Sequence, residues 1–265
     1  MGVKPGVISG TLIPCIGIYA FLSASVAGGT GAARQAEVSA PAPTTIPIES
    51  AGEPADGSPS IRGKVVVQGL KKSASREFNP YSELYGSPHK KAAGTERPGH
   101  LLVYLEHVPG KWHPPAKHAI LDQVNRQFTV DLLPVLVGTV VNFTNHDRIY
   151  HNVFTYSELQ PFDLGRRARN ETRSVEFHRL PQAGIGVIRV GCEIHANMHS
   201  VILVMRNPFW AVVDENGGSF EIRNVPPGTY TLTGWHDSLK AEPVRVDVAS
   251  GRVAEVVLNM AGGGE

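Results

Sequence analysis

Short hydrophobic runs, separated by Gly, Pro, Asn and Asp, recur along the chain from residue 61 almost to its end. Several alternate apolar and polar positions, and none after the N-terminal region sustains a long helical period. Such runs, rich in Val, Ile, Phe and Tyr, are typical of β-strands bounded by turns. The pattern predicts an all-β fold of the sandwich type, with strands at 61–67, 101–105, 120–124, 128–130, 135–137, 140–143, 151–154, 173–177, 185–190, 201–205, 220–222, 229–232, 244–248 and 253–258.

The first 60 residues do not fit this pattern. Residues 7–27 are nearly uncharged and apolar, follow Lys4 and end in small residues. This order is typical of a secretory signal peptide, so we expect residues 1–27 to direct export to the periplasm or the medium. If uncleaved, residues 7–27 approach the roughly 20 that span a bilayer and would anchor the chain in the membrane. Residues 28–59, rich in Ala, Pro, Thr and Ser, predict a flexible linker, and the polar residues 71–98 predict a long loop.

The net charge and the cysteine content limit the functions that are possible for this chain. The formal net charge is +1 at pH 7, which gives no support for binding to nucleic acid or to a charged membrane surface. The chain contains 2 cysteines, Cys15 and Cys192. Because Cys15 lies in the predicted signal, Cys192 would be the single thiol of the mature chain and could form no internal disulfide. Such a thiol is buried, paired with another chain or bound to a metal.

The surroundings of Cys192 favour a metal. Cys192, His195 and Met198 have two residues between each pair, so one tight loop between two predicted strands can present all three. His151 would come from another strand end, because the turns at one end of a sandwich lie together. Two His, one Cys and a weak Met are the ligands of a mononuclear type-1 (blue) copper site. Asn152, next to His151, could join the two ligand loops by side-chain hydrogen bonds.

Other chemistries use similar residues. Zinc could bind Cys192, two His and either Glu193 or Asp147. A binuclear copper site would need a second Cys, and a Cys–His nucleophilic dyad would need an orienting third group that is not evident. Copper is therefore the predicted metal, and zinc is the alternative.

Residues 119–206 resemble the cupredoxins. The resemblance lies in the Cys192-x2-His195-x2-Met198 loop, in His151-Asn152-Val153, in Gly138 before a strand and in Asn145 before the His turn. Ala196 departs from the short-loop cupredoxins, in which Pro follows the second His. The segment also resembles exported proteins described as methylamine-utilisation proteins.

The cupredoxin resemblance implies a Greek-key β-sandwich with one copper ion. His151, Cys192 and His195 would be the equatorial ligands and Met198 the weak axial ligand, with Asn152 and Asn145 supporting the ligand loops. The exposed edge of His195 would be the place where electrons leave.

The C-terminal segment resembles a second family. Asp214-x-Asn216-Gly217-x-x-Phe220-x-Ile222 and Val225-Pro226-x-Gly228-x-Tyr230-x-Leu232 are similar to the carboxypeptidase-regulatory-like, transthyretin-like sandwich. That family begins with a Gly-x-Val strand and a second apolar strand, which here lie far upstream. The resemblance implies a discontinuous sandwich of residues 60–110 and 207–262, into which a copper domain of residues 117–206 is inserted. Two consecutive domains are the alternative.

The predicted function is that of an exported copper protein that carries single electrons between periplasmic redox partners, and not that of an enzyme. Its partners would be transient protein contacts such as a cytochrome or a dehydrogenase. Two alternatives are a non-redox module that binds copper, protein or glycan, and a copper enzyme. The enzyme would need an open coordination position.

Overall fold

A computed structural model describes residues 58–68, 100–214 and 218–262. These residues form strands, turns and bends without a helix, so the predicted all-β fold class is confirmed for the described part of the chain. No helix there is long and apolar enough to cross a membrane. The predicted signal peptide, the linker up to residue 57 and the predicted loop at 71–98 lie outside the described residues.

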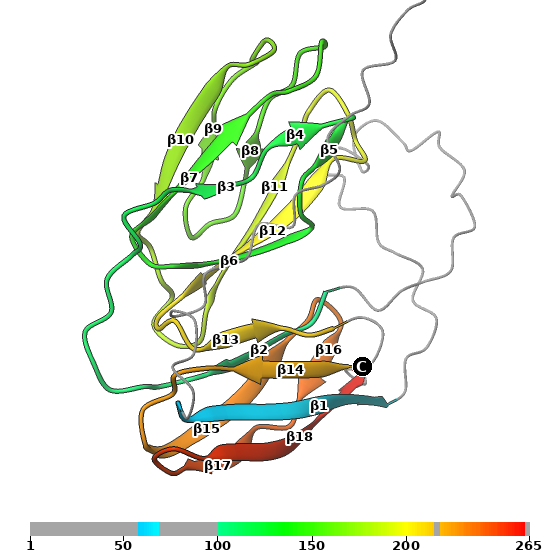
Figure 1. Ribbon diagram of the computed structural model, residues 1–265. Coiled ribbons are helices and arrows are strands. Elements are labelled where there is room, and N and C mark those ends of the chain that lie inside the picture. Colours follow the sequence, from blue (N-terminus) through cyan, green and yellow to red (C-terminus); the bar gives the residue numbers. More distant parts are fainter. Residues whose placement is uncertain (1–57, 69–99, 215–217, 263–265) are drawn as a thin grey trace, which may run out of the picture. The chain divides into compact units, whose positions relative to one another are not determined.

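The strands between residues 119 and 205 pair only among themselves (Figure 1). A three-stranded sheet contains β10 (Thr172–Phe177), β7 (Thr139–Thr144) and β3 (Ala119–Ile120) in that order. A five-stranded sheet contains β6 (Leu132–Leu136), β12 (His199–Met205), β11 (Gly186–Gly191), β8 (Phe154–Thr155) and β9 (Phe162–Asp163). A small hairpin joins β4 (Gln123–Val124) to β5 (Gln127–Phe128).

The core of this middle segment lies between its two larger sheets. Every second residue of β7 is buried, as expected for a strand with one face on a core. β11 follows nearly the same alternation. One cluster collects side chains from both sheets, including Val141, Phe143, Phe177, Ile188, Val190, Ile202 and Val204. The middle segment is therefore a β-sandwich whose strand ends can carry a site.

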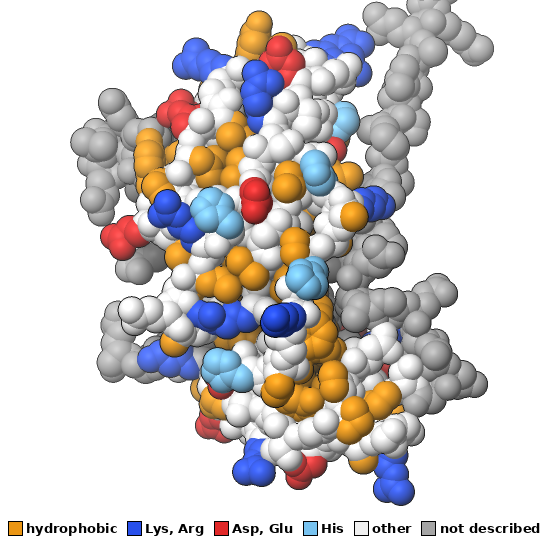
Figure 2. All heavy atoms as spheres, turned by 90° about the vertical axis from the view of Figure 1, so that its left-hand side faces the viewer, with side chains coloured by type: hydrophobic (Ala, Val, Ile, Leu, Met, Phe, Trp, Pro, Cys, Tyr) orange, Lys and Arg blue, Asp and Glu red, His pale blue; other side chains and the backbone are white. Residues whose placement is uncertain are grey.

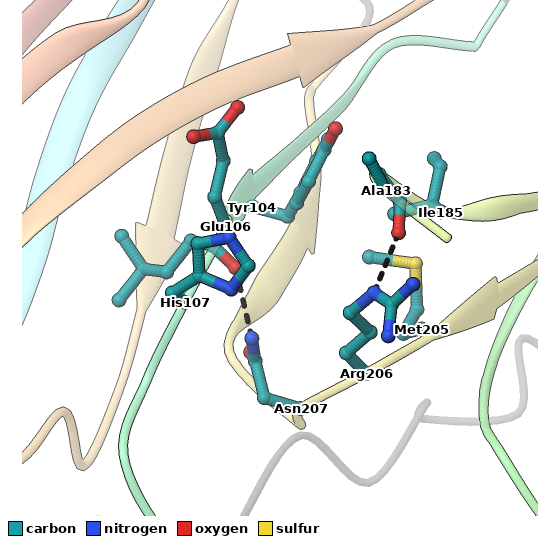
Figure 3. Close-up of a pocket in the computed structure, with 10 residues that line it drawn as sticks. Tyr104, Glu106, His107, Ala183, Ile185, Met205, Arg206 and Asn207 are labelled. Carbon is teal, nitrogen blue, oxygen red and sulfur yellow. Dashed lines mark hydrogen bonds between the residues drawn. The ribbon is translucent and has the colours of Figure 1, made fainter. Parts of the chain in front are cut away.

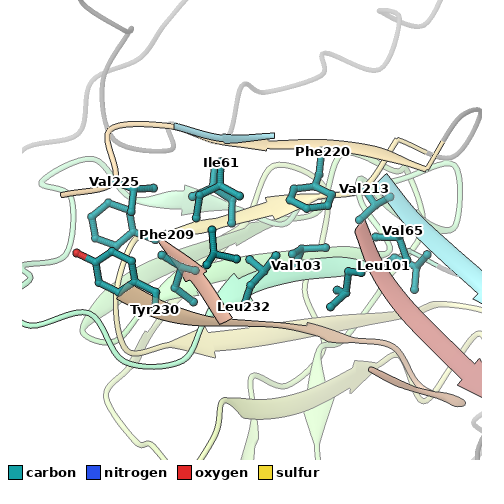
Figure 4. Close-up of a cluster of buried hydrophobic side chains, with 14 of the residues drawn as sticks. Ile61, Val65, Leu101, Val103, Phe209, Val213, Phe220, Val225, Tyr230 and Leu232 are labelled. Carbon is teal, nitrogen blue, oxygen red and sulfur yellow. The ribbon is translucent and has the colours of Figure 1, made fainter. Parts of the chain in front are cut away.

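The strands on either side of the middle segment form one eight-stranded sheet. Its order is β13 (Trp210–Val212), β2 (Leu102–Leu105), β15 (Gly228–Trp235), β16 (Leu239–Ala241), β18 (Val253–Gly262), β1 (Ser60–Gln68) and β14 (Ser219–Ile222), and β17 (Val244–Val248) pairs with β15. Apolar side chains from these strands pack into one core (Figure 4), among them Ile61, Val65, Val103, Phe209, Phe220 and Leu232. We call these eight strands and their core the flanking sandwich.

Strands from both ends of the described chain are joined in this sheet. β1 runs parallel to β18 and antiparallel to β14, and β2 lies between β13 and β15. A Cβ at Gly63 would lie 2.1 Å from the backbone oxygen of Val256 on β18, so only glycine permits this close approach. A smaller cluster, Leu102, Leu132, Leu136, Leu203, Met205 and Trp210, draws on both sets of strands.

The structure corrects several strand limits. The predicted strand at 120–124 is divided between β3 and β4, and the extended run at 151–154 contributes only Phe154 to β8. The short strands β9, β13 and β16 were not predicted. Each has two or three residues, too few for an alternating pattern, so backbone pairing with a neighbour defines them.

Charged side chains of both signs are dispersed over the face drawn in Figure 2, among apolar ones and several histidines. This dispersion agrees with the formal net charge of +1.

Candidate metal centre

Three predicted ligand residues come together from two separate loops. His151 precedes β8, and its backbone forms an antiparallel bridge with Arg167. Cys192 and His195 lie in the loop of residues 192–198 that joins β11 to β12. This loop closes on itself, because the Cys192 N–H donates to Met198 O at 3.2 Å and the Met198 N–H donates to His195 O at 3.0 Å.

The three candidate donor atoms form a compact triangle. His151 Nδ1 lies 3.0 Å from His195 Nδ1, and Cys192 Sγ lies 3.8 Å from the first nitrogen and 3.7 Å from the second. The point equidistant from the three lies inside the triangle at about 2 Å from each. Imidazole and thiolate bonds to a divalent metal measure about 2.0 and about 2.3 Å. The triangle therefore fits one ion with these three donors.

The orientation of His151 is fixed from its far side. Asp147 Oδ2 lies 2.8 Å from His151 Nε2, so Nδ1, on the opposite side of the ring, faces the other two donors. The same carboxylate accepts the backbone N–H groups of Asn125 at 2.7 Å and Arg126 at 2.8 Å. These two residues have φ values of 54° and 58° and make the tight turn between β4 and β5. A carboxylate behind an imidazole fixes the tautomer and raises its strength as a ligand.

Several donors act on the Asp147 carboxyl group. Burial alone would raise its pKa, but the N–H of Arg126, the His151 ring and the N–H of Asn125 outweigh burial and lower the pKa below the ordinary value. Asp147 therefore stays ionised at neutral pH and can accept a hydrogen bond from the His151 ring.

Two buried asparagines connect the backbone segments around the triangle. The Asn152 side-chain oxygen accepts the Glu193 N–H at 2.8 Å, which joins the His151 loop to the Cys192 loop. Asn145 donates through Nδ2 to Ile149 O at 2.8 Å and to Arg167 O at 2.9 Å. Its Oδ1 accepts the N–H of Asp147. The asparagines hold the strand ends that carry the donors.

Met198 and His195 differ in exposure. Met198 is 2% exposed and belongs to the same apolar cluster as Cys192. His195 is only partly buried. Burial lowers the pKa of His195, and the neighbouring charges of His151 and Arg126 act in the same direction. The neutral imidazole, which is the metal-binding form, is therefore favoured.

The partly exposed His195 lines an open surface hollow. Ile149, Tyr150, Ile194 and Arg166 line this hollow together with His195. The three apolar residues are 43%, 60% and 42% exposed respectively, and together they form an apolar surface around the hollow. One imidazole thus joins the donor triangle to an apolar surface.

A second hollow is a cavity of about 170 Å³ lined by Tyr104, Leu105, Glu106, His107, Ala183, Gly184, Ile185, Met205, Arg206 and Asn207 (Figure 3). Its polar groups bond mainly to backbone: Asn207 Nδ2 donates to Leu105 O at 2.9 Å and Arg206 Nε to Gly184 O at 3.0 Å. None of its lining residues is a candidate ligand, so this cavity has no connection with the metal centre.

The zinc alternative with a carboxylate ligand does not fit the geometry. Asp147 lies against Nε2 of His151, on the side of the ring away from Nδ1. Glu193 is exposed and outside the group of converging donors, which contains His151, Cys192 and His195 alone within the described residues.

Sequence reasoning missed the roles of two residues at the centre. It considered Asp147 only as an alternative zinc ligand, because the bond of Asp147 to His151 depends on a tertiary contact. Arg167 gave no signal, because Arg166-Arg167-Ala168-Arg169 has the composition of an exposed segment. Arg167 is nevertheless 0% exposed.

Comparison with known families gives one partial match. The family described as polysaccharide lyase family 4, domain II, matches residues 197–256. This range includes β12 of the middle segment and most of the C-terminal strands, but it leaves out β1 and β2, which pair with them. The resemblance to the carboxypeptidase-regulatory-like sandwich stays a prediction. Comparison with curated protein sequences gave no match.

Solved structures similar to this chain include copper proteins. A copper(I) form of an amicyanin variant is 18% identical, with 33% of this chain and 82% of that chain covered and a TM-score of 0.30. A reduced form of another amicyanin variant is 18% identical, with 35% of this chain and 92% of that chain covered and a TM-score of 0.31. A copper-containing nitrite reductase from Thermus scotoductus SA-01 is 21% identical, with 38% of this chain and 25% of that chain covered and a TM-score of 0.31. At these TM-scores the donor geometry, and not the likeness, supports a metal centre.

Proposed function

We propose that this chain is an exported protein that binds one type-1 copper ion and carries single electrons between periplasmic or secreted redox partners. His151, Cys192 and His195 would hold the ion, and Met198 would be a weak fourth ligand. The observation that supports the proposal is the triangle of Nδ1, Nδ1 and Sγ atoms around a point about 2 Å from each.

The donor set favours copper over other metals. A thiolate with two imidazoles suits both Cu(I) and Cu(II), and bound copper would supply one-electron chemistry by cycling between them. The protein's part is to hold the donors still in both states. Asp147 fixes the ring of His151, and Asn152 ties its loop to the Cys192 loop.

We propose a carrier and not an enzyme. With Met198 as a fourth ligand the metal would have no position left for substrate, whereas catalytic metal sites keep one open. Electrons would leave through His195, the candidate ligand that also reaches the surface hollow.

The partner would be an acidic redox protein. The apolar hollow at His195 includes Arg166, and the charge of Arg126 also acts on His195. Exposed positive charges around an apolar contact attract a partner with carboxylates at the rim of its own contact surface. Such an encounter is small and transient.

We also propose that the middle segment is a domain inserted into the flanking sandwich. The pairing of β1 with β14 and β18, and of β2 with β15, supports this division. The flanking sandwich contains no cluster of converging His, Cys, Asp or Glu donors among its described residues, and we assign it a structural or docking role.

The test is to add copper to the purified chain and record its visible and electron paramagnetic resonance spectra. An intense thiolate-to-copper band at one equivalent is expected. Copper binding without the band would point to storage or transport without redox function, and the absence of binding would refute the proposal.

A further inference from the structure

Arg167 is a buried cation at the metal centre. Its side chain is 0% exposed, and its backbone pairs with that of His151 through two hydrogen bonds of 3.2 and 2.7 Å. Nη1 donates to Phe143 O at 2.8 Å and Nη2 to Gln123 Oε1 at 2.6 Å. Nε has no hydrogen-bond partner within the described structure. Both acceptors are neutral, so the hydrogen bonds leave the positive charge in place.

No carboxylate forms an ion pair with Arg167 in the part of the chain that the structure describes. The acidic groups that act on it from a distance, Glu171 and Asp122, are held by other donors. Glu171 accepts the N–H of Ala168, and Asp122 accepts the N–H of Thr144. A fully buried arginine without a bound anion is costly, so a nearby negative charge is expected to compensate it.

With copper bound, the Cys192 thiolate would supply such a charge. Burial lowers the pKa of Arg167, the charge of Arg173 lowers it further, and a negative charge at Cys192 would work in the opposite direction. A chain of hydrogen bonds also leads from Arg167 to the ligand loop. Gln123, which accepts from Arg167, donates to Asn152 O at 3.1 Å, and Asn152 accepts the N–H of Glu193 next to Cys192.

We propose that the buried charge of Arg167 raises the reduction potential of the copper centre; this role rests on the proposed function. With one thiolate bound, the oxidised centre carries a net positive charge and the reduced centre carries none. A fixed cation in the interior, where solvent screens little, disfavours the oxidised state. Arg167 would act on the copper centre through its fixed positive charge and would not itself be a ligand.

The test compares copper-loaded chains with Arg167 replaced. Arg167→Met removes the charge with a side chain of similar length, Arg167→Gln keeps a polar end, and Arg167→Lys keeps the charge. In both neutral variants we expect the equilibrium between Cu(I) and Cu(II) to shift roughly tenfold toward Cu(II). This shift lowers the reduction potential by about 59 mV. The lysine variant should remain near the unsubstituted chain. The readouts are the potential from spectroscopic titration and the position of the thiolate band.

Arg166 supplies the matched control. It is exposed and adjacent to Arg167, so the effect of Arg166→Met should be smaller and should vanish at high salt, whereas the Arg167→Met effect should persist. Neutral variants that bind copper with an unchanged potential would overturn the role of Arg167 and leave the copper proposal intact. A lysine variant with the same drop as the neutral variants would also overturn it, because shape and not charge would then matter. Failure of the unsubstituted chain to bind copper would instead refute the proposed function.

Discussion

The two sandwiches of this chain bury different kinds of side chain. The flanking sandwich encloses an almost wholly apolar core, and its buried polar residues are Ser60, Asn207 and Thr233, none of them charged. The middle sandwich buries nine polar residues: Gln123, Thr139, Asn145, His151, Asn152, Thr155, Gln160, Arg167 and Ser200.

The different numbers of buried polar residues indicate that the two sandwiches have different roles. An unpaired buried polar group costs about 1–3 kcal/mol. Gln123, Asn145 and His151 avoid that cost by hydrogen bonding, whereas Asn152 Nδ2 and Arg167 Nε have no partner in the described structure. Asn145, Asn152 and Gln123 each bridge two segments. A core that only stabilised the fold would not need these groups. The middle sandwich therefore holds the candidate site, and the flanking sandwich provides apolar burial.

The largest effect is expected from Cys192→Ala. Because the sulfur is one of three converging donors, its loss should abolish the thiolate-to-copper band completely. Visible spectroscopy after addition of copper measures this. Cys15→Ala, at the other cysteine of the sequence, should leave the band unchanged. A Cys192→Ala chain that keeps the band would refute the ligand assignment.

Leu232→Ala tests the other side of the comparison. Leu232 is 0% exposed in the flanking core, so the cavity should lower the free energy of unfolding by about 2–5 kcal/mol. The thiolate band of the folded, copper-loaded chain should stay the same. Denaturant titration and visible spectra are the measurements. A changed band in the folded variant would show that the two sandwiches do not divide their roles.

Asp147→Asn should weaken copper binding by roughly 10–100-fold, because the amide cannot accept from His151 and from both backbone N–H groups as the carboxylate does. Competition with a copper chelator measures the affinity. Asp247→Asn, at an exposed aspartate of the flanking sandwich, is the control. An unchanged affinity for Asp147→Asn would mean that the bond to His151 does not orient the ring.

Acid should destabilise the copper-free chain. The pKa of His195 in the folded state lies below its ordinary value of 6.5, so the unfolded state binds more protons as the pH falls through 6.5. Stability from this group is complete above that pH and declines below it. Thermal unfolding between pH 7.5 and 5 measures the decline, and His195→Ala should reduce its slope. An equal slope in the variant would contradict this assignment.

The smallest effect concerns the surface around His195. Arg126→Glu and Arg166→Glu should slow oxidation of the reduced chain by anionic hexacyanoferrate(III) a few-fold at low salt and accelerate oxidation by cationic tris(phenanthroline)cobalt(III). Stopped-flow kinetics measure both rates, and Arg252→Glu on the flanking sandwich is the control. Rates that do not depend on these charges would contradict an acidic partner.

The fold class and the local part of the candidate site were both predictable from the amino-acid sequence. Hydrophobic runs of strand length indicate which side chains face a core. Most of the strands between β1 and β18 were therefore predictable. The spacing of Cys192, His195 and Met198 is also local, because one loop carries all three. His151 could be added because strand ends of a sandwich meet at one end.

The pairing of β1 and the surroundings of the donors could not be predicted, because both depend on contacts between distant parts of the folded chain. The pattern of apolar residues in a strand indicates which face is buried but not which strand lies next to it. β1 pairs with β18, which lies nearly two hundred residues later in the chain. Arg167 depends on Gln123, 44 residues earlier, and Asp147 on a turn at Asn125 and Arg126. A polar residue has no periodic signature when its burial depends on a partner that only folding supplies. For that reason the charge beside the candidate ligands could not be read from the run of arginines that contains it.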